Sequence, residues 1–482
     1  MRRAELVFVP APGVGHLVSL IEFAKCLIER DDRLSITVLV IKSPFANILD
    51  AFIQSITASH TRIKCILLPP VDPPPGEVFL SSVEKFVTDF IESHKSHVKE
   101  AIIGSVLSNS IPLAGLVVDM FCTAMIDVAH ELGVPSYVYY PSNAAFLGYM
   151  LYLPTRHDQV GVEFSESDPE SSIIPSYVNS VPSSALPSFA FNKEGGYISM
   201  VNHGRKYKEA NGILVNSFHE LESHAFSSFL ADGIPPVYGV GPLINLKGEI
   251  NSEANEAEHE KIRKWLDDQP PSSVVFLCFG SWGSFSAPQL KETALALERS
   301  GHRFIWSVRL DSLESPPGEK VAAPSDRPNL EEVLPVGFLE RTREIGMICG
   351  WAPQVEVLAH KAIGGFVSHC GWNSILESLW HGVPIAAWPI YAEQQINSFL
   401  MVRDLGLAVE LKLDYRLGGE VVAAEEIEKA VKCLMDGESE VRKRVKEMSE
   451  KSRKAVVNGG SSFASIGRLI ESMLGNNVES TL

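Results

Sequence analysis

Short β-branched runs alternate along the chain with segments in which apolar residues recur every three or four positions. The runs are typical of buried strands in a parallel sheet, and the longer segments of helices that cover such a sheet. In the first half the expected strands are Leu6–Val9, Ile36–Ile41, Ile63–Leu68, Leu116–Val118 and Ser136–Tyr140, and the expected helices are Leu17–Glu29 and Thr123–Leu132. This alternation predicts a doubly wound α/β domain.

A second series of the same kind begins after Pro270 and Pro271. Its expected strands are Val274–Phe279, Phe304–Val308, Met347–Cys349, Gly365–Ser368 and Pro384–Ala387. Its expected helices are Ala287–Glu298, Gln354–Ala359, Asn373–Trp380, Gln394–Asp404, and two near Glu438–Val456 and Phe463–Leu474. The chain has 482 residues, and single cores stop growing at roughly 250–300 residues. We therefore expect two domains.

Polar segments divide the chain. Asn245–His259 is acidic and without periodicity, which is typical of a surface linker. We place an N-terminal domain at residues 1–244, the linker at 245–259, a second domain at 260–459, and a C-terminal helix and tail at 460–482, with the helix packing back on the first domain. Proline predicts loops at Pro69–Gly76 and Leu310–Asn329, and the acidic, Ser-rich stretch Asp158–Ser172 predicts a surface excursion.

Composition and charge narrow the class of protein. Hydrophobic residues make up 45% and charged residues 21%, as in ordinary globular proteins. The net charge of −17 argues against nonspecific binding to nucleic acid or anionic lipid. Seven cysteines without a C-x-x-C pair predict neither a zinc ribbon nor a full disulfide framework. Glu5 and Pro10 interrupt the N-terminal apolar run, as they would not in a secretory signal, and no run approaches the ~18 residues of a membrane span. We therefore expect a cytoplasmic protein. We also expect a monomer.

A candidate base follows the first strand, in the stretch Pro10–His16. Gly13 and Gly15 resemble a dinucleotide fingerprint, but position 18 is Val, so the motif gives NAD binding little support. We place His16 on the loop at the carboxyl end of the strand, where open α/β sheets bind their ligands. A histidine there can act as a general base, and the alternative is a capping or merely exposed histidine.

Asp119 ends the apolar run Leu113–Val118 and so lies at the same rim of the sheet as His16. An aspartate that accepts the Nδ1 proton of His16 would fix its tautomer and stabilise the imidazolium. These two residues also occur in hydrolase triads, but no G-x-S-x-G motif accompanies them, and Ser19 lacks that context. A base that activates a substrate hydroxyl fits better than an acyl-enzyme.

The segment Trp351–Gln394 concentrates candidate binding residues and holds four of the seven tryptophans. His369–Ser374 runs from the end of a strand into a helix, so free N–H groups there predict an anion site. The segment has three Glu against one Lys, so a phosphate would be held without a basic side chain from it. Glu377, one turn further, could accept from a ribose diol. The alternative is a buried αβ unit with core tryptophans and capping Asn and Ser.

This segment resembles the signature box of the plant family 1 UDP-sugar glycosyltransferases: it begins Trp-Ala-Pro-Gln, contains His-Cys-Gly-Trp-Asn-Ser, and closes in Glu393 and Gln394. The likeness spans the chain, because Pro-x-Pro-Gly-x-Gly before His16 matches the family's catalytic loop, Asp119 its charge-relay position, and Phe279-Gly280-Ser281 its phosphate loop. The resemblance implies the GT-B fold, in which two Rossmann-like domains face each other across a cleft, with the donor in the second domain and the acceptor in the first.

The resemblance also implies roles for single residues. The UDP-sugar site would comprise Ser281, Trp351, Ala352, Gln354, His369, Gly371, Trp372, Asn373, Ser374, Glu377, Glu393 and Gln394. Trp351 would stack on uracil, Glu377 would bind the ribose, and the residues at 281, 369 and 371–374 would hold the diphosphate. Glu393 and Gln394 would bind the sugar, with Gln at 394 associated with glucose and His with galactose. Trp282 is bulkier than the residue expected there.

The implied reaction is inverting transfer of glucose from UDP-glucose to a hydroxyl of a small lipophilic acceptor, such as a phenolic, flavonoid or terpenoid alcohol of plant secondary metabolism. His16 would be the base and Asp119 its partner. No cofactor is expected, and no metal, because the chain has no D-x-D sequence. The alternatives are a His/Asp hydrolase of small esters and a noncatalytic nucleotide-sugar binding protein. We expect the loops Pro69–Gly76, Asn143–Leu153 and Phe189–Val201 to shape the acceptor pocket.

Overall fold

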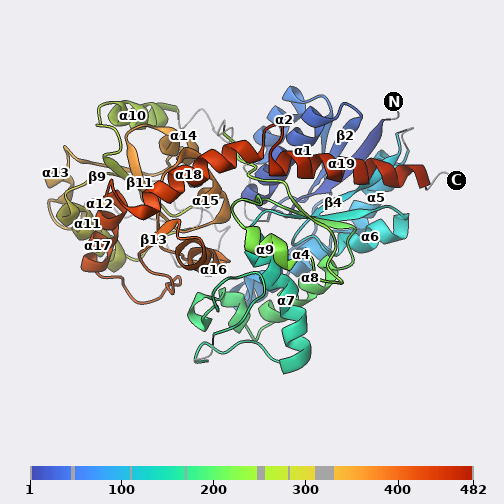
Figure 1. Ribbon diagram of the computed structural model, residues 1–482, viewed down its shortest axis with the longest axis horizontal. Helices are drawn as coiled ribbons and strands as arrows, with labels where there is room; N and C mark the ends of the chain where they lie inside the picture. The colour runs from blue at the N-terminus through green and yellow to red at the C-terminus, as the bar shows by residue number, and fades with distance from the viewer. Residues whose placement is uncertain are drawn as a thin grey trace.

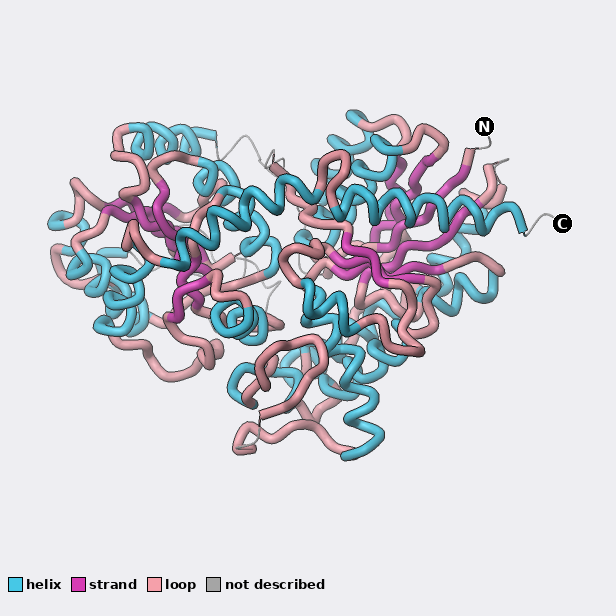
Figure 2. Tube along the Cα trace, viewed as in Figure 1, coloured by secondary structure: helices cyan, strands magenta, loops and turns pink. Residues whose placement is uncertain are grey.

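The computed structural model describes residues 3–44, 49–108, 111–168, 171–246, 256–280, 283–309 and 330–479. It has two lobes, each built on a parallel sheet with helices around it (Figures 1 and 2). This is the two-domain Rossmann-like architecture expected from the alternation of strands and helices.

The first sheet has seven strands in the order β3-β2-β1-β4-β5-β6-β7. They are β1 Ala4–Val9, β2 Leu34–Val40, β3 Ile63–Leu67, β4 Leu113–Asp119, β5 Ser136–Tyr140, β6 Gly212–Val215 and β7 Val237–Gly239. The helices of this part of the chain are α1 Val14–Arg30, α2 Leu49–Ser59, α3 Gly76–Ser81, α4 Val83–Glu92, α5 Lys95–Ser105, α6 Met125–Leu132, α7 Ala144–Val160, α8 Gly196–Tyr207 and α9 Ser223–Ser228. Short 3-10 turns η1 and η2 cover Ser183–Ala185 and Ser188–Phe191.

The second sheet has six strands in the order β10-β9-β8-β11-β12-β13. They are β8 Val274–Cys278, β9 Arg303–Ser307, β10 Gly346–Cys349, β11 Ile363–Ser368, β12 Ile385–Ala387 and β13 Ala408–Glu410. The helices are α10 Glu256–Asp267, α11 Ala287–Ser300, α12 Leu330–Val333, α13 Phe338–Arg341, α14 Gln354–Ala359, α15 Trp372–His381, α16 Gln394–Phe399, α17 Ala424–Met435, α18 Glu440–Ala455 and α19 Ser461–Glu479. A π-helical turn, Leu400–Asp404, continues α16.

Both sheets reverse their strand order at one place, between β1 and β4 in the first and between β8 and β11 in the second. Open α/β sheets bind ligands at such switch points, beyond the carboxyl ends of the strands. His16 and Asp119 follow or end β1 and β4, whereas Gly280 and His369 follow β8 and β11. The topology therefore gives each domain one ligand-binding edge.

The C-terminal helices connect the two lobes. Figure 1 shows α18 over the second lobe and α19 running along the first. Leu469 and Met473 of α19 are fully buried in the same apolar cluster as Phe8 of β1 and Phe23 of α1. None of the helices in the described ranges combines the length and apolarity that a membrane crossing requires.

Several element boundaries differ from the sequence expectations. Helix α1 begins at Val14, so His16 lies in its first turn and not on a loop. Helix α10 begins at Glu256, inside the predicted linker, and α7 extends to Val160, so the predicted excursion at Asp158–Ser172 begins in a helix. The single helix expected at Gln394–Asp404 is an α-helix followed by the π-helical turn.

Two of the three segments that were expected to be loops around the acceptor pocket are largely helical. Asn143 caps α7, which contains the rest of Asn143–Leu153, and Phe189–Val201 is largely η2 and α8. Helix α7 escaped detection because most of its residues from Ala144 to Pro154 are buried, which removes the amphipathic period. The loop predicted at Leu310–Asn329 lies outside the described residues.

Candidate active site

The switch point of the first sheet brings together a histidine and an aspartate. His16 Nδ1 lies 2.8 Å from Asp119 Oδ2, and the Asp119 side chain is fully buried, whereas 30% of the His16 side chain is exposed. The other carboxylate oxygen accepts from the backbone N–H of Phe121 at 3.1 Å. Because Asp119 can only accept when ionised, His16 carries its proton on Nδ1 and Nε2 is left able to accept one.

The charge of Asp119 also sets the proton affinity of His16. Burial lowers the pKa of His16, but the charge and hydrogen bond of Asp119, together with the charge of Glu393, outweigh it and raise the pKa above its ordinary value. A raised pKa means a stronger base near neutrality. The two residues that the sequence predicted as a pair are therefore joined by a hydrogen bond in the structure.

The N-terminus of α15 faces this pair from the second domain. Gly371 caps the helix without a side-chain hydrogen bond, so the first-turn N–H groups stay available. A Cβ on Gly15 of α1 would lie 3.7 Å from Asn373 Nδ2, which shows how closely the two helix starts approach. The side-chain oxygen Oδ1 of Asn373 is buried without a hydrogen-bond partner in the described part of the chain. This end of α15 is suited to an anion that lies between the domains.

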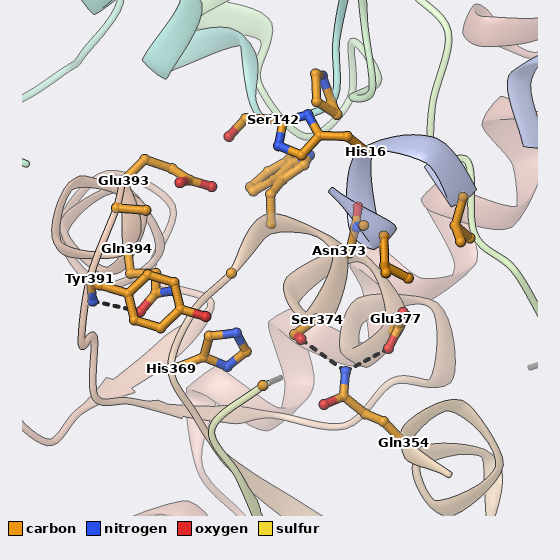
Figure 3. Close-up of a pocket in the computed structure, with 18 of the residues that line it drawn as sticks. His16, Ser142, Gln354, His369, Asn373, Ser374, Glu377, Tyr391, Glu393 and Gln394 are labelled. Atoms are coloured by element: carbon orange, nitrogen blue, oxygen red, sulfur yellow. Dashed lines mark hydrogen bonds between the residues drawn. The ribbon is translucent and has the colours of Figure 1, made fainter. Parts of the chain in front are cut away.

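His369 lies beside this helix start, as Figure 3 shows. Burial lowers the pKa of His369 to about 4, so its imidazole is neutral and can donate one hydrogen bond. Its Nδ1 is buried with no partner among the described residues. Gly280 has a φ of +75°, and a Cβ there would lie only 2.6 Å from His369 Nε2. Position 280 thus requires glycine for two reasons: its φ is positive, and a larger side chain would collide with the ring of His369.

Gln354 joins two other predicted ligands. Its Nε2 donates to Ser374 Oγ at 2.8 Å and to Glu377 Oε2 at 2.7 Å (Figure 3). Burial raises the pKa of Glu377 to about 7, although the Gln354 N–H group opposes that rise. A buried carboxylate that is costly to ionise is stabilised by two hydroxyl donors, which is what a ribose offers.

Trp351 presents an indole to the same cavity. The residue is 42% exposed, which is unusual for tryptophan, and the guanidinium of Arg309 lies 5.1 Å from its ring centroid. Arg309 lines the cavity as well. No local sequence pattern marks Arg309, because it lies beyond the end of β9 and outside the segment Trp351–Gln394. The cavity therefore does have a permanent positive charge in its wall.

Gln394 is held more tightly than the sequence suggested. Its side chain is almost fully buried, and its Oε1 accepts from the backbone N–H groups of Ile390 at 2.9 Å and Tyr391 at 3.0 Å. Because Oε1 already accepts two backbone hydrogen bonds, Nε2 is the atom through which Gln394 would donate to a sugar hydroxyl. Burial raises the pKa of the neighbouring Glu393, partly opposed by the charge of His16.

Buried polar contacts hold the two domains in register around the site. The indole Nε1 of Trp372 donates to the Asn216 carbonyl oxygen at 2.7 Å. Asn143 Nδ2 donates to Asn397 Oδ1 at 2.6 Å, and Asn397 donates in turn to the Cys370 carbonyl oxygen at 3.1 Å. No local sequence pattern marks these contacts, because each joins residues more than a hundred positions apart or depends on the packing of α16.

One cavity of about 510 Å³ collects these groups from both domains. It is lined by His16 and by the predicted donor residues Trp351, Ala352, Gln354, His369, Gly371, Trp372, Asn373, Ser374, Glu377, Glu393 and Gln394. Asp119 lies behind His16, outside the lining. Ser281 and Trp282 lie outside the described residues. The structure thus gathers nearly every predicted residue at one cleft.

Comparisons with known proteins agree with this arrangement. Residues 235–452 match the family model described as UDP-glucoronosyl and UDP-glucosyl transferase. The chain is 53% identical to UDP-glycosyltransferase 71K1 of Malus domestica, over 99% of this chain and all of that protein. It is 50% identical to UDP-glucose flavonoid 3-O-glucosyltransferase 6 of Fragaria ananassa, over 98% of each.

A solved structure gives the same result for the fold. The crystal structure of Medicago truncatula UGT71G1 complexed with UDP-glucose superposes with a TM-score of 0.90, at 49% identity over 98% of each chain. The likeness therefore covers both domains. The chain belongs to the plant family 1 UDP-dependent glycosyltransferases, with the GT-B fold.

Proposed function

We propose that this enzyme transfers glucose from UDP-glucose to a hydroxyl of a small lipophilic acceptor, with inversion at the anomeric carbon. The observation that carries the proposal is the hydrogen bond between His16 and Asp119. His16 lines the same cavity as the start of α15, where no side chain caps the helix. His16 Nε2 takes the proton of the acceptor hydroxyl as the oxygen attacks the anomeric carbon. The bond between that carbon and the UDP oxygen breaks in the same displacement, so the configuration inverts.

The groups that receive charge in this reaction are in place. Asp119 stabilises the imidazolium formed on His16. The N–H groups at the start of α15, with neutral His369 and Asn373, are positioned for the negative charge on the departing UDP. Trp351 and Glu377 would position uridine through stacking and hydrogen bonding. The binding site for the donor therefore needs little from the first domain.

The acceptor side is apolar, which supports a lipophilic substrate. Met120, Phe121, Phe146, Phe189 and Met200 line the part of the cavity formed by the first domain. The flavonoid named for the Fragaria relative is an aromatic alcohol of this general kind. Of the three segments expected to shape this pocket, α7 and the η2–α8 region contribute lining residues, whereas Pro69–Gly76 contributes none.

A hydrolase is less well supported. Ser19, the serine one turn beyond His16, is buried and its Oγ lies 2.6 Å from the hydroxyl oxygen of Tyr139. It is therefore not available as a nucleophile. Incubation of the enzyme with a panel of phenols, flavonoids and terpenoid alcohols, with and without UDP-glucose, tests the proposal. A β-glucoside formed only with UDP-glucose supports it, and ester hydrolysis without a UDP-sugar would contradict it.

Activity is expected to persist in excess EDTA. The charge on the diphosphate can be met by the α15 N-terminus, His369 and Asn373 without a divalent cation, because preorganised N–H donors stabilise phosphate effectively. The measurement is the initial rate of glucoside formation in metal-depleted buffer with EDTA and with added Mg²⁺ or Mn²⁺. Loss of turnover in EDTA that Mn²⁺ restores would contradict this prediction.

Gln394 is expected to favour glucose over galactose. Loss of one hydrogen bond to a partly buried sugar hydroxyl costs about 1–3 kcal/mol, equivalent to about 5- to 150-fold in kcat/KM. UDP-galactose should therefore be a poor donor for the wild type, and Gln394→His should shift the ratio of kcat/KM toward it while lowering total activity. Gln394→Glu is a useful comparison, because it can still accept from the N–H groups of Ile390 and Tyr391 but lacks the Nε2 donor. An unchanged ratio in both variants would show that Gln394 does not distinguish the sugars.

A further inference from the structure

The acceptor side of the cavity contains one carboxylate that the proposed mechanism does not use. Most lining residues from the first domain are apolar, and Glu84 stands among them. Within the described residues, it is the only acidic side chain that the first domain contributes to this lining. The other acidic lining residues, Glu356, Glu377 and Glu393, come from the second domain. Glu84 is therefore a polar group on the wall that faces the acceptor.

Local hydrogen bonds fix the position of Glu84 in the first turn of α4. Ser82 caps this helix: its Oγ accepts from the Lys85 N–H group at 3.1 Å and donates to Glu84 Oε2 at 3.3 Å. Thr88 Oγ1 donates to the Glu84 carbonyl oxygen at 2.8 Å. Phe86 of the same helix is buried. The carboxylate is thus presented from an anchored helix and not from a mobile loop.

A buried histidine ties this helix to the catalytic region. His203 of α8 lies 3.0 Å from Thr88 Oγ1 through Nε2 and 2.8 Å from Thr123 Oγ1 through Nδ1. Burial lowers the pKa of His203 to about 4, so the ring is neutral. The hydroxyl hydrogen of Thr88 is used in its hydrogen bond to the backbone carbonyl of Glu84. His203 therefore donates from Nε2 to Thr88 and accepts at Nδ1 from Thr123.

Two rings bridge the distance between this helix and the base. The His203 ring meets Phe121 edge-on, with centroids 5.9 Å apart, and Phe121 lies 5.5 Å from the His16 ring. Packed aromatic rings of this kind have little freedom to shift. Packed side chains therefore fix the position of α4, the helix that carries Glu84, relative to His16.

Within the part of the chain that the structure describes, the carboxylate of Glu84 has no charged partner. Burial raises its pKa, and the groups that oppose this are its own backbone N–H and the Ser82 hydroxyl, neither of them charged. The pKa of His16, in contrast, responds to Asp119 and Glu393. A carboxylate oxygen has about two acceptor sites, so Glu84 keeps capacity for donors from a ligand. Leaving such a group unpaired beside an apolar ligand is unfavourable.

We propose that Glu84 selects the acceptor by accepting a hydrogen bond from a second hydroxyl or amino group at the end remote from the glucosylated oxygen. This inference rests on the proposed function and narrows its substrate class to rigid aromatic acceptors with a hydrogen-bond donor at both ends. Diphenols satisfy this requirement. Monophenols leave Glu84 unpaired, and acceptors with a remote carboxylate are repelled by it.

The test uses two acceptor sets of different length, so that it does not depend on one spacing. The one-ring set is phenol, hydroquinone and 4-hydroxybenzoate, and the two-ring set is 4-hydroxybiphenyl, 4,4′-dihydroxybiphenyl and 4′-hydroxybiphenyl-4-carboxylate. Values of kcat/KM at saturating UDP-glucose are measured for the wild type, Glu84→Gln, Glu84→Leu and the control Glu92→Gln. Glu92 is an exposed residue at the end of the same helix, outside the cavity lining. UDP affinity, measured by calorimetry, checks that each variant is folded.

In at least one set the wild type should prefer the diphenol to the monophenol by about ten-fold or more, as hydrogen bonds to charged groups contribute. Glu84→Leu should abolish that preference, and Glu84→Gln should raise kcat/KM for the carboxylate acceptor by about ten-fold, because the like charge is removed. Glu92→Gln should match the wild type.

Preferences that are unchanged in Glu84→Leu, or absent from the wild type in both sets, would overturn the inference. A wild type that transfers glucose to none of the six phenols would instead contradict the proposed function. Calorimetric affinities of the phenols in the presence of UDP would then decide the role of Glu84. Equal affinities for diphenol and monophenol in the wild type and Glu84→Leu would overturn it.

Discussion

His16→Ala is expected to lower kcat by about 10²–10⁴-fold, the usual contribution of a positioned general base, and to leave the affinity for UDP-glucose nearly unchanged. The reason is that the base and the residues for the donor lie in different domains. His16 belongs to α1 of the first domain, whereas the residues that would hold the donor belong to β8–α16 of the second. Removing the imidazole therefore deprives the acceptor hydroxyl of its base without touching the donor contacts.

The measurement combines steady-state kinetics with calorimetric titration of UDP-glucose. His219→Ala is a matched control, because His219 is an exposed residue of the same domain and does not line the cavity. Added imidazole should restore part of the activity of His16→Ala, since a small base can enter the space vacated by the side chain. Equal losses of turnover and donor affinity would show that His16 serves binding and not proton transfer.

Asp119→Asn is expected to lower kcat by about 10²–10⁴-fold although the side chain keeps its shape. The backbone N–H of Phe121 donates to one oxygen of Asp119 and would hold the amide oxygen of an asparagine in the same place. The amide NH₂ group would then point at His16 Nδ1, which lies 2.8 Å from the other oxygen. His16 would have to accept there and carry its proton on Nε2, the wrong tautomer for a base.

The pH dependence of kcat/KM tests independently whether Asp119 raises the pKa of His16. His16 acts as a base only when unprotonated, so activity rises as the pH passes upward through its pKa. In the wild type Asp119 raises that pKa, which moves the acid limb of kcat/KM to higher pH than an unperturbed histidine would give. Without the charge of Asp119, burial lowers the pKa of His16 with less opposition, and the limb should move to lower pH.

Asp158→Asn serves as the control, since Asp158 is an exposed residue near the end of α7. Its profile should coincide with that of the wild type. An Asp119→Asn enzyme with full activity, or with its acid limb at the wild-type pH, would contradict the role of Asp119.

The strands that build the site were predictable because they are long, apolar and buried on both faces. In β4 all seven residues are buried, so nothing in its pattern competes with a strand. The short strands β6, β7 and β13 were missed, because three or four residues are too few to show a period. Helix α7 was missed for the opposite reason: burial on nearly every side removed its polar face.

The sequence by itself determined the chemistry of this protein. The glycines, the helix start at Gly371 and the residues that end parallel strands are local features, and they predicted that His16 and Asp119 lie at the same rim of the sheet. Tertiary structure decided which side chains meet at the cavity: the guanidinium of Arg309 lies over the ring of Trp351, backbone N–H groups of the folded loop donate to Gln394 Oε1, and Glu84 lines the same cavity as His16. Local patterns record which conformation a segment prefers, but a side chain's neighbours across a cleft are set only when both domains are packed.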